Sequence, residues 1–175
     1  MDFYALAKDR YSCRSFDPNR PVLDSDIEKI LTAAQIAPTA VNAQRQRIRV
    51  VKSQKGLSYI HRCSNCHFNA PVVLIITYEQ EMKGFGMKVP AAIEHKIGLM
   101  DVGIVAAHIT LQAKALGLDS CITASFDEQQ MRRDFSIPAT EVAALVIPIG
   151  YASANSQISH WHEETISLST MCQEV

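Results

Sequence analysis

The chain has 175 residues, of which 47% are hydrophobic and 20% are charged, a composition typical of a folded domain rather than a disordered chain. Its 17 lysines and arginines against 18 aspartates and glutamates give a net charge of −1, so no overall positive field would hold it on nucleic acid or an anionic membrane. The longest apolar stretch, residues 102–113, is too short to span a bilayer, and we expect no signal peptide. Five cysteines, an odd number, fit reduced thiols better than a secreted disulfide scaffold. We therefore expect one cytoplasmic domain over residues 1–175.

The first half of the chain is predicted to form three helices and two strands. The helices cover residues 3–10, 25–37 and 54–62, and the strands cover residues 47–52 and 72–76. Ser25 and Glu28 have the spacing of a capping box at the start of the second helix, and Pro38 disfavours helix in the residue before it. The second strand is an uninterrupted apolar run, which predicts burial on both faces.

In the second half, residues 79–95 have no firm pattern, and a helix that is apolar on all sides follows over residues 99–116, closed by Gly117. Such a helix belongs at the centre of a domain. The remaining predicted elements are a strand over 120–124, a helix over 127–135 and a strand over 142–149. Alternating helices and buried strands predict an α/β or α+β fold with a covered sheet. The polar residues after Tyr151, which include the single Trp161, are either frayed or packed on another surface such as a partner subunit.

The first candidate for chemistry lies just beyond the first helix. Arg10 and Arg14 stand four residues apart with Ser12 between them. Guanidinium groups suit phosphate oxygens, and a serine hydroxyl can complete such a site. The alternative is a pair of solvated arginines, one of them paired with Asp9 or Asp17.

A second candidate is the segment from Ala37 to Gln44, between the end of a helix and the start of a strand. Its small side chains would let a flat ligand approach, and the amides of Asn42 and Gln44 offer donors and acceptors to a heterocycle. The alternative is an ordinary connecting loop. The sequence carries no glycine-rich fingerprint of a Rossmann fold or a P-loop.

In their order and spacing, these segments resemble the FMN-dependent nitroreductase family. The matching segments are the arginine-rich opening 10–16, the A-P-T-x-x-N-x-Q loop 37–44, the approach to the second strand 65–72, the central helix and its glycine-rich end 101–121, and the closing Gly150-Tyr151. The resemblance covers residues 3–166. It implies an α+β fold with a mixed central sheet flanked by helices, in an intertwined homodimer that binds FMN at the subunit interface. Residues 152–175 would then pack on the partner subunit.

The resemblance implies that Arg10, Ser12 and Arg14 bind the phosphate and ribityl chain of FMN, in agreement with the reading of these side chains. The family usually completes this site with R-x-R after its closing G-Y. Here His160 and His162 take that place, so the site would be less positive at pH 7, where histidine is mostly neutral.

The residues implied around the flavin ring come from three loops and are Pro38, Thr39, Ala40, Asn42, Gln44, Asn65, Thr123, Ala124 and Ser125. The first loop would place its two amides beside the flavin and its first three residues on the isoalloxazine of the partner. Asn65 would face the pyrimidine edge. Backbone N–H groups of the third loop would point at the N5 and O4 edge. No side chain is expected to act as a general acid or base, because an open pocket can draw protons from water.

Two further departures from the family pattern concern the substrate side. Arg45, Arg47 and Arg49 follow the second loop, where the family has Q-P-W, and on a strand they would share one face. We interpret them mainly as a solvated face, with guidance of an anionic substrate or NADPH as the alternative. The short segment between Tyr78 and Asp101 implies a more open pocket.

The implied function is an FMN-dependent oxidoreductase that uses NADH or NADPH to reduce nitroaromatic, quinone or similar small acceptors in ping-pong turnover. The alternative is a metal- or redox-responsive binding module at Cys63, Cys66 and His67, which form a C-x-x-C-H pattern with His61 nearby. Haem attachment to this pattern would require export, and one C-x-x-C is half of a usual zinc or iron–sulfur site. We therefore interpret the pattern as coincidental and expect no metal. Cys121 is expected to be a buried apolar residue.

Overall fold

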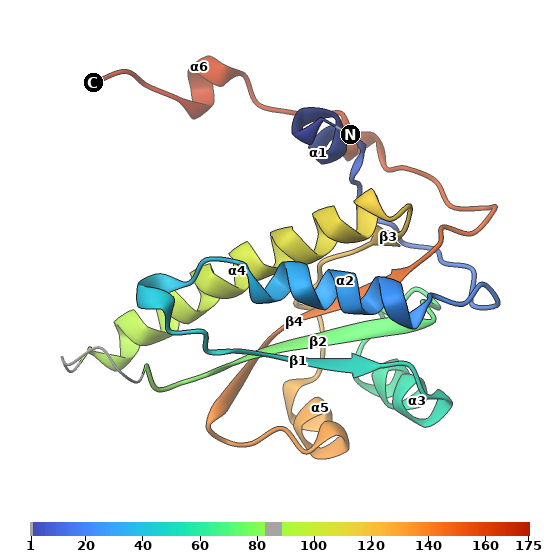
Figure 1. Ribbon diagram of the computed structural model, residues 1–175, viewed down its shortest axis with the longest axis horizontal. Coiled ribbons are helices and arrows are strands. Elements are labelled where there is room, and N and C mark those ends of the chain that lie inside the picture. Colours follow the sequence, from blue (N-terminus) through green and yellow to red (C-terminus); the bar gives the residue numbers. More distant parts are fainter. Residues whose placement is uncertain (1, 83–88) are drawn as a thin grey trace.

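The computed structural model describes residues 2–82 and 89–175 and shows a sheet covered by helices on both faces (Figure 1). Its strands are β1 (Gln46–Val51), β2 (Val72–Glu79), β3 (Asp119–Ser120) and β4 (Glu141–Gly150). Their order is β1-β2-β4-β3, and all neighbours pair antiparallel. The predicted α+β class is confirmed. The parallel part of the expected mixed sheet is limited, in the described ranges, to an isolated bridge between Ser12 and Ser120.

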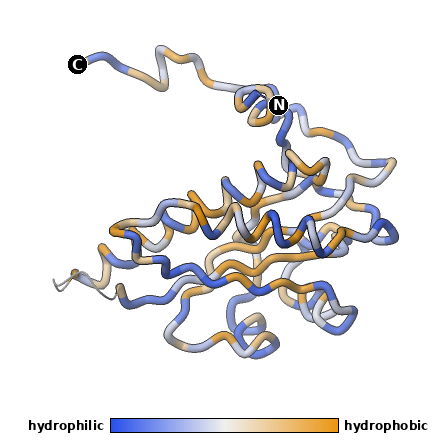
Figure 2. Tube along the Cα trace, viewed as in Figure 1, coloured by the Kyte–Doolittle hydropathy of each residue, from blue (hydrophilic) through white to orange (hydrophobic). Residues whose placement is uncertain are grey.

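The central strand β2 is buried on both faces, as its apolar run predicts. Leu74 and Ile76 join a core cluster on one side of the sheet, whereas Val73 and Ile75 join a second cluster on the other side. Figure 2 shows the hydrophobic residues concentrated along the middle strands. Because successive strand residues point to opposite faces, one apolar run supplies both cores.

One face of the sheet is covered by α2 (Asp24–Gln35) and α4 (Ala91–Ala115), which pack on each other. The predicted capping box is wrong: α2 begins one residue earlier, its N-cap is Leu23, and no side chain caps it. Ser25 therefore lies inside the first turn. The acidic Asp24 and Asp26 favour this end of the helix through its dipole.

Helix α4 begins eight residues before its predicted start. Part of the segment without a firm pattern, residues 79–95, therefore forms helix, while residues 83–88 of it lie outside the described part of the chain. Gly98 lets this helix approach the ring of Tyr78, since an added Cβ would lie 2.3 Å from a ring carbon. The all-round apolar character does not make α4 fully buried in a single chain, because Leu99, Met100 and Ile104 are exposed.

The opposite face carries α3 (Gln54–Cys63) and α5 (Glu128–Phe135), which contact each other. Serine and aspartate side chains cap their first turns: Ser53 accepts from the N–H of Gly56, and Asp127 accepts from that of Gln130. These helices match their predicted positions to within one or two residues.

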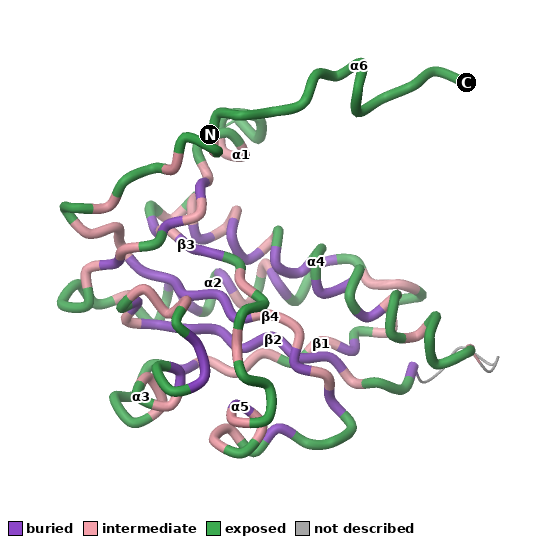
Figure 3. Tube along the Cα trace, turned by 180° about the vertical axis from the view of Figure 1, so that it is seen from behind, coloured by how far each residue is buried: buried purple, intermediate pink, exposed green. Residues whose placement is uncertain are grey.

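Shorter elements lie at the margins: α1 (Phe3–Asp9), η1 (Ala40–Asn42), η2 (His160–His162) and α6 (Leu168–Met171). Strand β3 ends at Ser120, four residues before its predicted end, and the chain regains the sheet only at an isolated bridge between Thr123 and Val146. Residues after Ser156 are mostly exposed (Figure 3). None of the helices in the described part of the chain has the length and apolar character that crossing a membrane requires.

Candidate functional site

A cavity of about 230 Å³ lies where the segment after α1 meets the C-terminal tail. The residues that line it are Arg10, Tyr11, Ser12, Arg14, Ser159, Trp161 and His162. They supply two guanidinium groups, two aliphatic hydroxyl groups and an imidazole, and no carboxylate. This donor set fits a phosphate group. A larger cavity of about 510 Å³, between α3 and residues 18–22, is lined by none of the predicted site residues.

The backbone around residues 10–14 explains why the predicted phosphate residues share one side. Tyr11 and Cys13 are 9% and 0% exposed and point into the second core. The N–H of Cys13 donates to the carbonyl of Ser120 at 3.0 Å, which fixes the segment alongside β3. In an extended chain, alternate residues face opposite sides, so the three predicted phosphate ligands face outward together.

The two arginines of this cavity are not neutralised by the acidic residues that the sequence placed nearby. Asp9 lies 3.3 Å from Lys114, and a carboxylate oxygen of Asp17 accepts from the backbone N–H of Asn19. Among the described residues, no carboxylate lies within 4 Å of either guanidinium group. Both cations remain available for an anion, which disfavours the simple surface ion pair.

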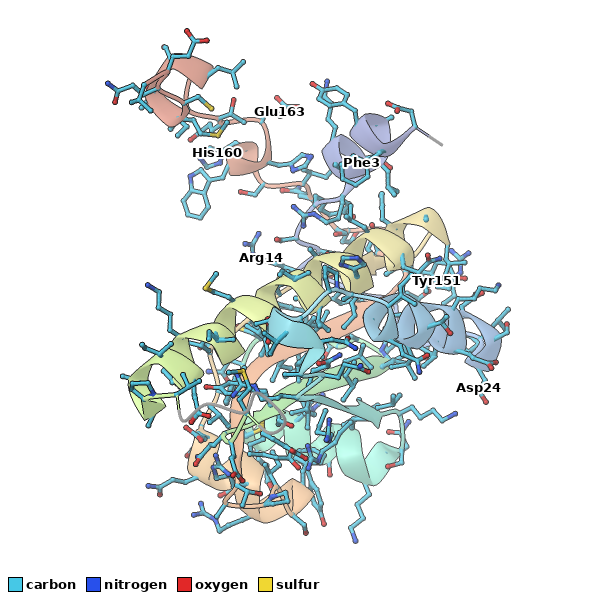
Figure 4. The ribbon with its side chains drawn as sticks, turned by 60° about the vertical axis from the view of Figure 1, so that its left-hand side comes forward. Phe3, Arg14, Asp24, Tyr151, His160 and Glu163 are labelled. Atoms are coloured by element: carbon cyan, nitrogen blue, oxygen red, sulfur yellow. The ribbon has the colours of Figure 1, made fainter. Side chains whose placement is uncertain are left out.

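The two tail histidines have different positions. His162 lines the cavity, and its ring packs edge-on against Tyr11 with centroids 6.2 Å apart. His160 lies outside the lining, with 75% of its side chain exposed, and is 3.6 Å from Glu164. Figure 4 shows this turn with His160 and Glu163 standing away from the layered body of the chain. Of the pair, the structure therefore brings only His162 to the predicted phosphate ligands.

The predicted flavin loop, residues 38–44, is held in place by a buried carboxylate. The N–H of Ala40 donates to Oδ1 of Asp101 on α4 at 2.9 Å. Asp101 is 5% exposed, and its Oδ2 is buried without a partner among the described residues. This role was not predicted, because Asp101 stands in a segment that reads as an apolar helix and its partner, Ala40, is 61 residues away in the chain.

The same loop has an unusual backbone. Val41, Asn42 and Gln44 have φ angles of 48°, 55° and 47°, in the left-handed region that side chains normally avoid. Gln44 donates from its backbone N–H to Thr39 Oγ1 at 3.1 Å and from its amide to Asn42 Oδ1 at 3.0 Å. Such strain persists only where the surroundings fix it, and it is common at ligand sites.

Within one chain, this loop and the phosphate cavity lie at different points along α4 (Figure 1). The loop contacts Asp101, near the middle of the helix, whereas Ser12 of the cavity lining pairs with Ser120 of β3, which follows the last turn of the helix. From Asp101 to Ala115 the helix rises by about 21 Å. A single chain therefore does not bring the two parts of the predicted site together.

Two other predicted parts of the flavin site, Asn65 and the turn 123–125, are adjacent. Ser64 Oγ donates to the carbonyl of Ser125 at 2.7 Å, which places the exposed Asn65 beside the turn 123–125. Two of the predicted backbone donors are already used: the N–H of Thr123 donates to Val146, and that of Ser125 donates to Thr123 Oγ1. Of these three residues, Ala124 is the one whose N–H has no acceptor among the described residues.

The prediction that the three arginines after this loop form a solvated face is wrong. Arg45 is 3% exposed and donates to the carbonyls of Glu79, Gln80 and Glu94. Arg49 makes a two-pronged ion pair with the buried Glu141. The remaining arginine, Arg47, is half-exposed and pairs with Glu79 at 2.7 Å. These residues hold the sheet together, and they offer little to an anionic substrate.

The C-x-x-C-H segment does not form a ligand cluster. Burial raises the pKa of Cys63 to about 11, and its thiol donates to the carbonyl of Ile60. His67 stacks on His61 with centroids 3.7 Å apart, and burial lowers its pKa. Over the described ranges, no three His, Cys, Asp or Glu side chains are grouped as metal ligands. Cys121 is buried, as expected.

Comparison with known proteins places these features in a family context. The sequence model of the Nitroreductase family matches residues 7–67 and 62–151. A protein of Methanothermobacter thermautotrophicus, provisionally named as an NADH dehydrogenase/NAD(P)H nitroreductase, is 30% identical over 162 residues, covering 89% of this chain and 80% of its own. The structure of a nitroreductase family protein from Clostridium difficile 630 is similar with a TM-score of 0.84 and 29% identity, covering 99% of this chain and 98% of that one. A structure in complex with FMN from Exiguobacterium sibiricum shares the fold, with a TM-score of 0.89 at 20% identity over 100% of this chain and 98% of that one.

Proposed function

Because the chain belongs to the nitroreductase family, we propose that it is an FMN-dependent oxidoreductase that takes electrons from NADH or NADPH and reduces nitroaromatics, quinones or similar small acceptors. The observation that carries this proposal is the cavity in which a serine hydroxyl meets two guanidinium groups, neither of them paired with a carboxylate of the described residues. FMN, when bound, supplies the hydride chemistry, and the protein supplies position and electrostatics.

The residues of the cavity hold the phosphate end. Arg10 and Arg14 bind the phosphate oxygens, and Ser12 donates its hydroxyl. Tyr11 and Cys13, on the buried side of the same segment, fix these three side chains because they anchor the backbone in the second core. Rigid anchoring of this kind lowers the entropy that a ligand must lose on binding.

The protein acts as a homodimer in this proposal, and the partner completes the site. The loop 38–44 is too far from the cavity of its own chain to contact the same cofactor, so it packs on the cofactor of the partner. Exposed apolar residues on α4, such as Met100 and Ile104, and in the tail, such as Leu168 and Met171, need a cover that a single chain does not provide. The first part of the predicted tail, residues 152–162, stays on its own chain, since the N–H of Ser153 donates to the carbonyl of Ser15 and His162 lines the cavity. The rest of the tail, up to residue 175, packs on the partner within one intertwined domain of residues 1–175.

Three loops surround the flavin ring. Pro38, Thr39 and Ala40 pack on its face, with Asn42 and Gln44 beside it, in the conformation that Asp101 fixes from α4. Asn65 faces the pyrimidine edge, and the N–H of Ala124 donates to the side where reduction places negative charge. A preorganised donor at that position stabilises charge as it develops. Protons come from water, and no side chain serves as general acid or base.

The compartment is proposed to be the cytoplasm. All five cysteines are free in the structure, which fits a reducing environment better than an oxidising one.

The test begins with the absorption spectrum of the purified protein and the identity of any flavin released on denaturation. FMN is then titrated into the apoprotein and into Arg10→Ala, whose loss of a charged hydrogen bond should weaken binding by about 1.5–3 kcal/mol, roughly 10- to 150-fold. Arg133→Ala, an exposed arginine on α5, is the matched control and should bind normally. Absence of FMN binding in the unchanged protein would refute the function, and equal affinity in Arg10→Ala would refute the anchor.

A further inference from the structure

The cavity that is proposed to hold the FMN phosphate contains one group whose charge ordinarily changes between pH 5 and 8. Of its seven lining residues, Arg10 and Arg14 stay cationic throughout that range, and Ser12, Ser159 and Trp161 carry no charge. The pKa of Tyr11 is raised to about 12, first by burial and then by the negative charge of Asp119, so this phenol stays neutral. The remaining ionisable residue of the lining is His162, and histidine is the residue type whose charge ordinarily changes in this range.

The placement of His162 is fixed by its surroundings. It ends the short η2 turn, which Ser159 caps by accepting from the N–H of Trp161 at 3.4 Å. Its ring is half-buried and rests edge-on against Tyr11. The ring therefore lies in the lining of the same cavity as the two arginines.

The charged groups nearest to His162 within the cavity are cations. From the N-terminal segment, Arg10 and Arg14 share the lining with it, so an anion that enters the cavity meets all three basic side chains. Behind Tyr11, Lys114 lies 5.2 Å from the ring centre and is paired with Asp9 and Asp119.

On the turn itself, His160 is directed to Glu164, and Glu163 follows in the chain. Among the described residues, no carboxylate lies within 4 Å of the His162 imidazole, whereas His160 has one at 3.6 Å. A bound phosphate would be the nearest negative charge to this ring.

We infer that His162 takes up a proton when a phosphate monoester enters the cavity, so that it makes FMN binding stronger as the pH falls from 8 to 6. This inference rests on the proposed function. It predicts that the protein loads FMN with net proton uptake and holds it less tightly at alkaline pH. The phosphate of FMN itself gains a proton near pH 6, which acts in the opposite direction, so variants are needed to isolate the histidine.

The experiment measures the FMN dissociation constant from quenching of flavin fluorescence at pH 6, 7 and 8 and constant ionic strength. Wild type, His162→Gln, His162→Arg and the matched control His160→Gln are compared. The dissociation constant of His162→Gln divided by that of wild type should be about 10 at pH 6, since a charged donor is exchanged for a neutral one. This ratio should fall towards 1 at pH 8. His162→Arg should match wild type at pH 6 and bind about tenfold tighter at pH 8. His160→Gln should follow wild type throughout.

Two further measurements distinguish failure of this inference from failure of the proposed function. Calorimetric titration in buffers of different ionisation enthalpy should show proton uptake in wild type and less uptake in His162→Gln. Riboflavin, which lacks the phosphate, should show no dependence on His162. A pH-independent ratio with normal FMN binding would overturn this inference and leave the proposed function intact. Failure of the wild type and of every variant to bind FMN would overturn both. His162→Arg keeps the test valid where His162→Gln does not fold.

Discussion

Glu141, at the start of β4, joins three strands through one buried carboxylate. Arg49 of β1 donates to its two oxygens at 2.8 and 3.1 Å, and the hydroxyl of Thr77 on β2 donates to it as well. The Glu141 side chain is 10% exposed and that of Arg49 is 26% exposed. Hydrogen bonds from Arg49 contribute most to holding the pKa of Glu141 below its usual range.

Replacing Glu141 by Gln keeps the shape of the side chain and removes its charge. Leaving one member of a buried ion pair unpaired costs about 3–5 kcal/mol, and because Arg49 retains some contact with water we expect a loss of about 2–4 kcal/mol in the free energy of unfolding at pH 7. Asp24→Asn is the control, because the Lys52–Asp24 pair is exposed on both sides and should contribute less than about 1 kcal/mol.

The pH dependence provides a second, independent check. A carboxylate whose folded pKa is depressed stabilises the fold fully above its unfolded pKa, about 4.3, and loses that contribution as the pH falls through the folded value. The difference in the free energy of unfolding between wild type and Glu141→Gln should therefore be constant from pH 6 to 8 and should disappear at lower pH. Urea unfolding at fixed protein concentration measures it. A gap under about 0.5 kcal/mol at pH 7, or one that persists unchanged at pH 3, would refute the reasoning.

Three other outcomes follow from local geometry. Gly98→Ala should destabilise the protein by about 1–3 kcal/mol in thermal unfolding, because the new methyl group overlaps the ring of Tyr78, and an unchanged midpoint would contradict the packing. Asp101→Ala should speed hydrogen exchange at the amide of Ala40, whereas Asp101→Asn, which keeps an acceptor, should preserve most of the protection. Cys63, buried and with a thiol pKa of about 11, should resist iodoacetamide at pH 8 after the exposed cysteine near the C-terminus has reacted, and equal labelling by mass spectrometry would show that it is accessible.

The parts of the fold that the sequence predicted well are those whose cause is local. The apolar run of β2 requires burial, and it is buried on both faces as predicted. The start of α4 was not predicted because its first turns are held by contacts with residues distant in the sequence. Arg45 donates to the carbonyl of Glu94, and the carboxylate of Glu94 accepts from the N–H of Met82. The sequence of residues 91–98 has no periodic pattern from which those contacts could be predicted.

In the candidate site too, the residues with a local sequence pattern were predicted, and those placed by long-range contacts were not. Arg10, Ser12 and Arg14 were predicted as one group from their residue types and spacing, and the structure places all three in the lining of one cavity. Ser159 and Trp161, which line the same cavity, were not predicted, because the return of the tail depends on long-range bonds. One such bond runs from the N–H of Ser153 to the carbonyl of Ser15. A histidine in place of an arginine was visible in the sequence, but only the structure separates His162 from His160.

The loop 38–44 shows why the remainder could not be read from residue types. A buried carboxylate is costly, and Asp101 carries one oxygen with no partner among the described residues. Its other oxygen fixes Ala40, next to a run of left-handed residues that includes the β-branched Val41, for which that conformation is most unfavourable. Neither feature is favourable alone. Together they place two amides and a backbone turn on the surface in one conformation, and the cost of both is best explained by a ligand that requires this conformation.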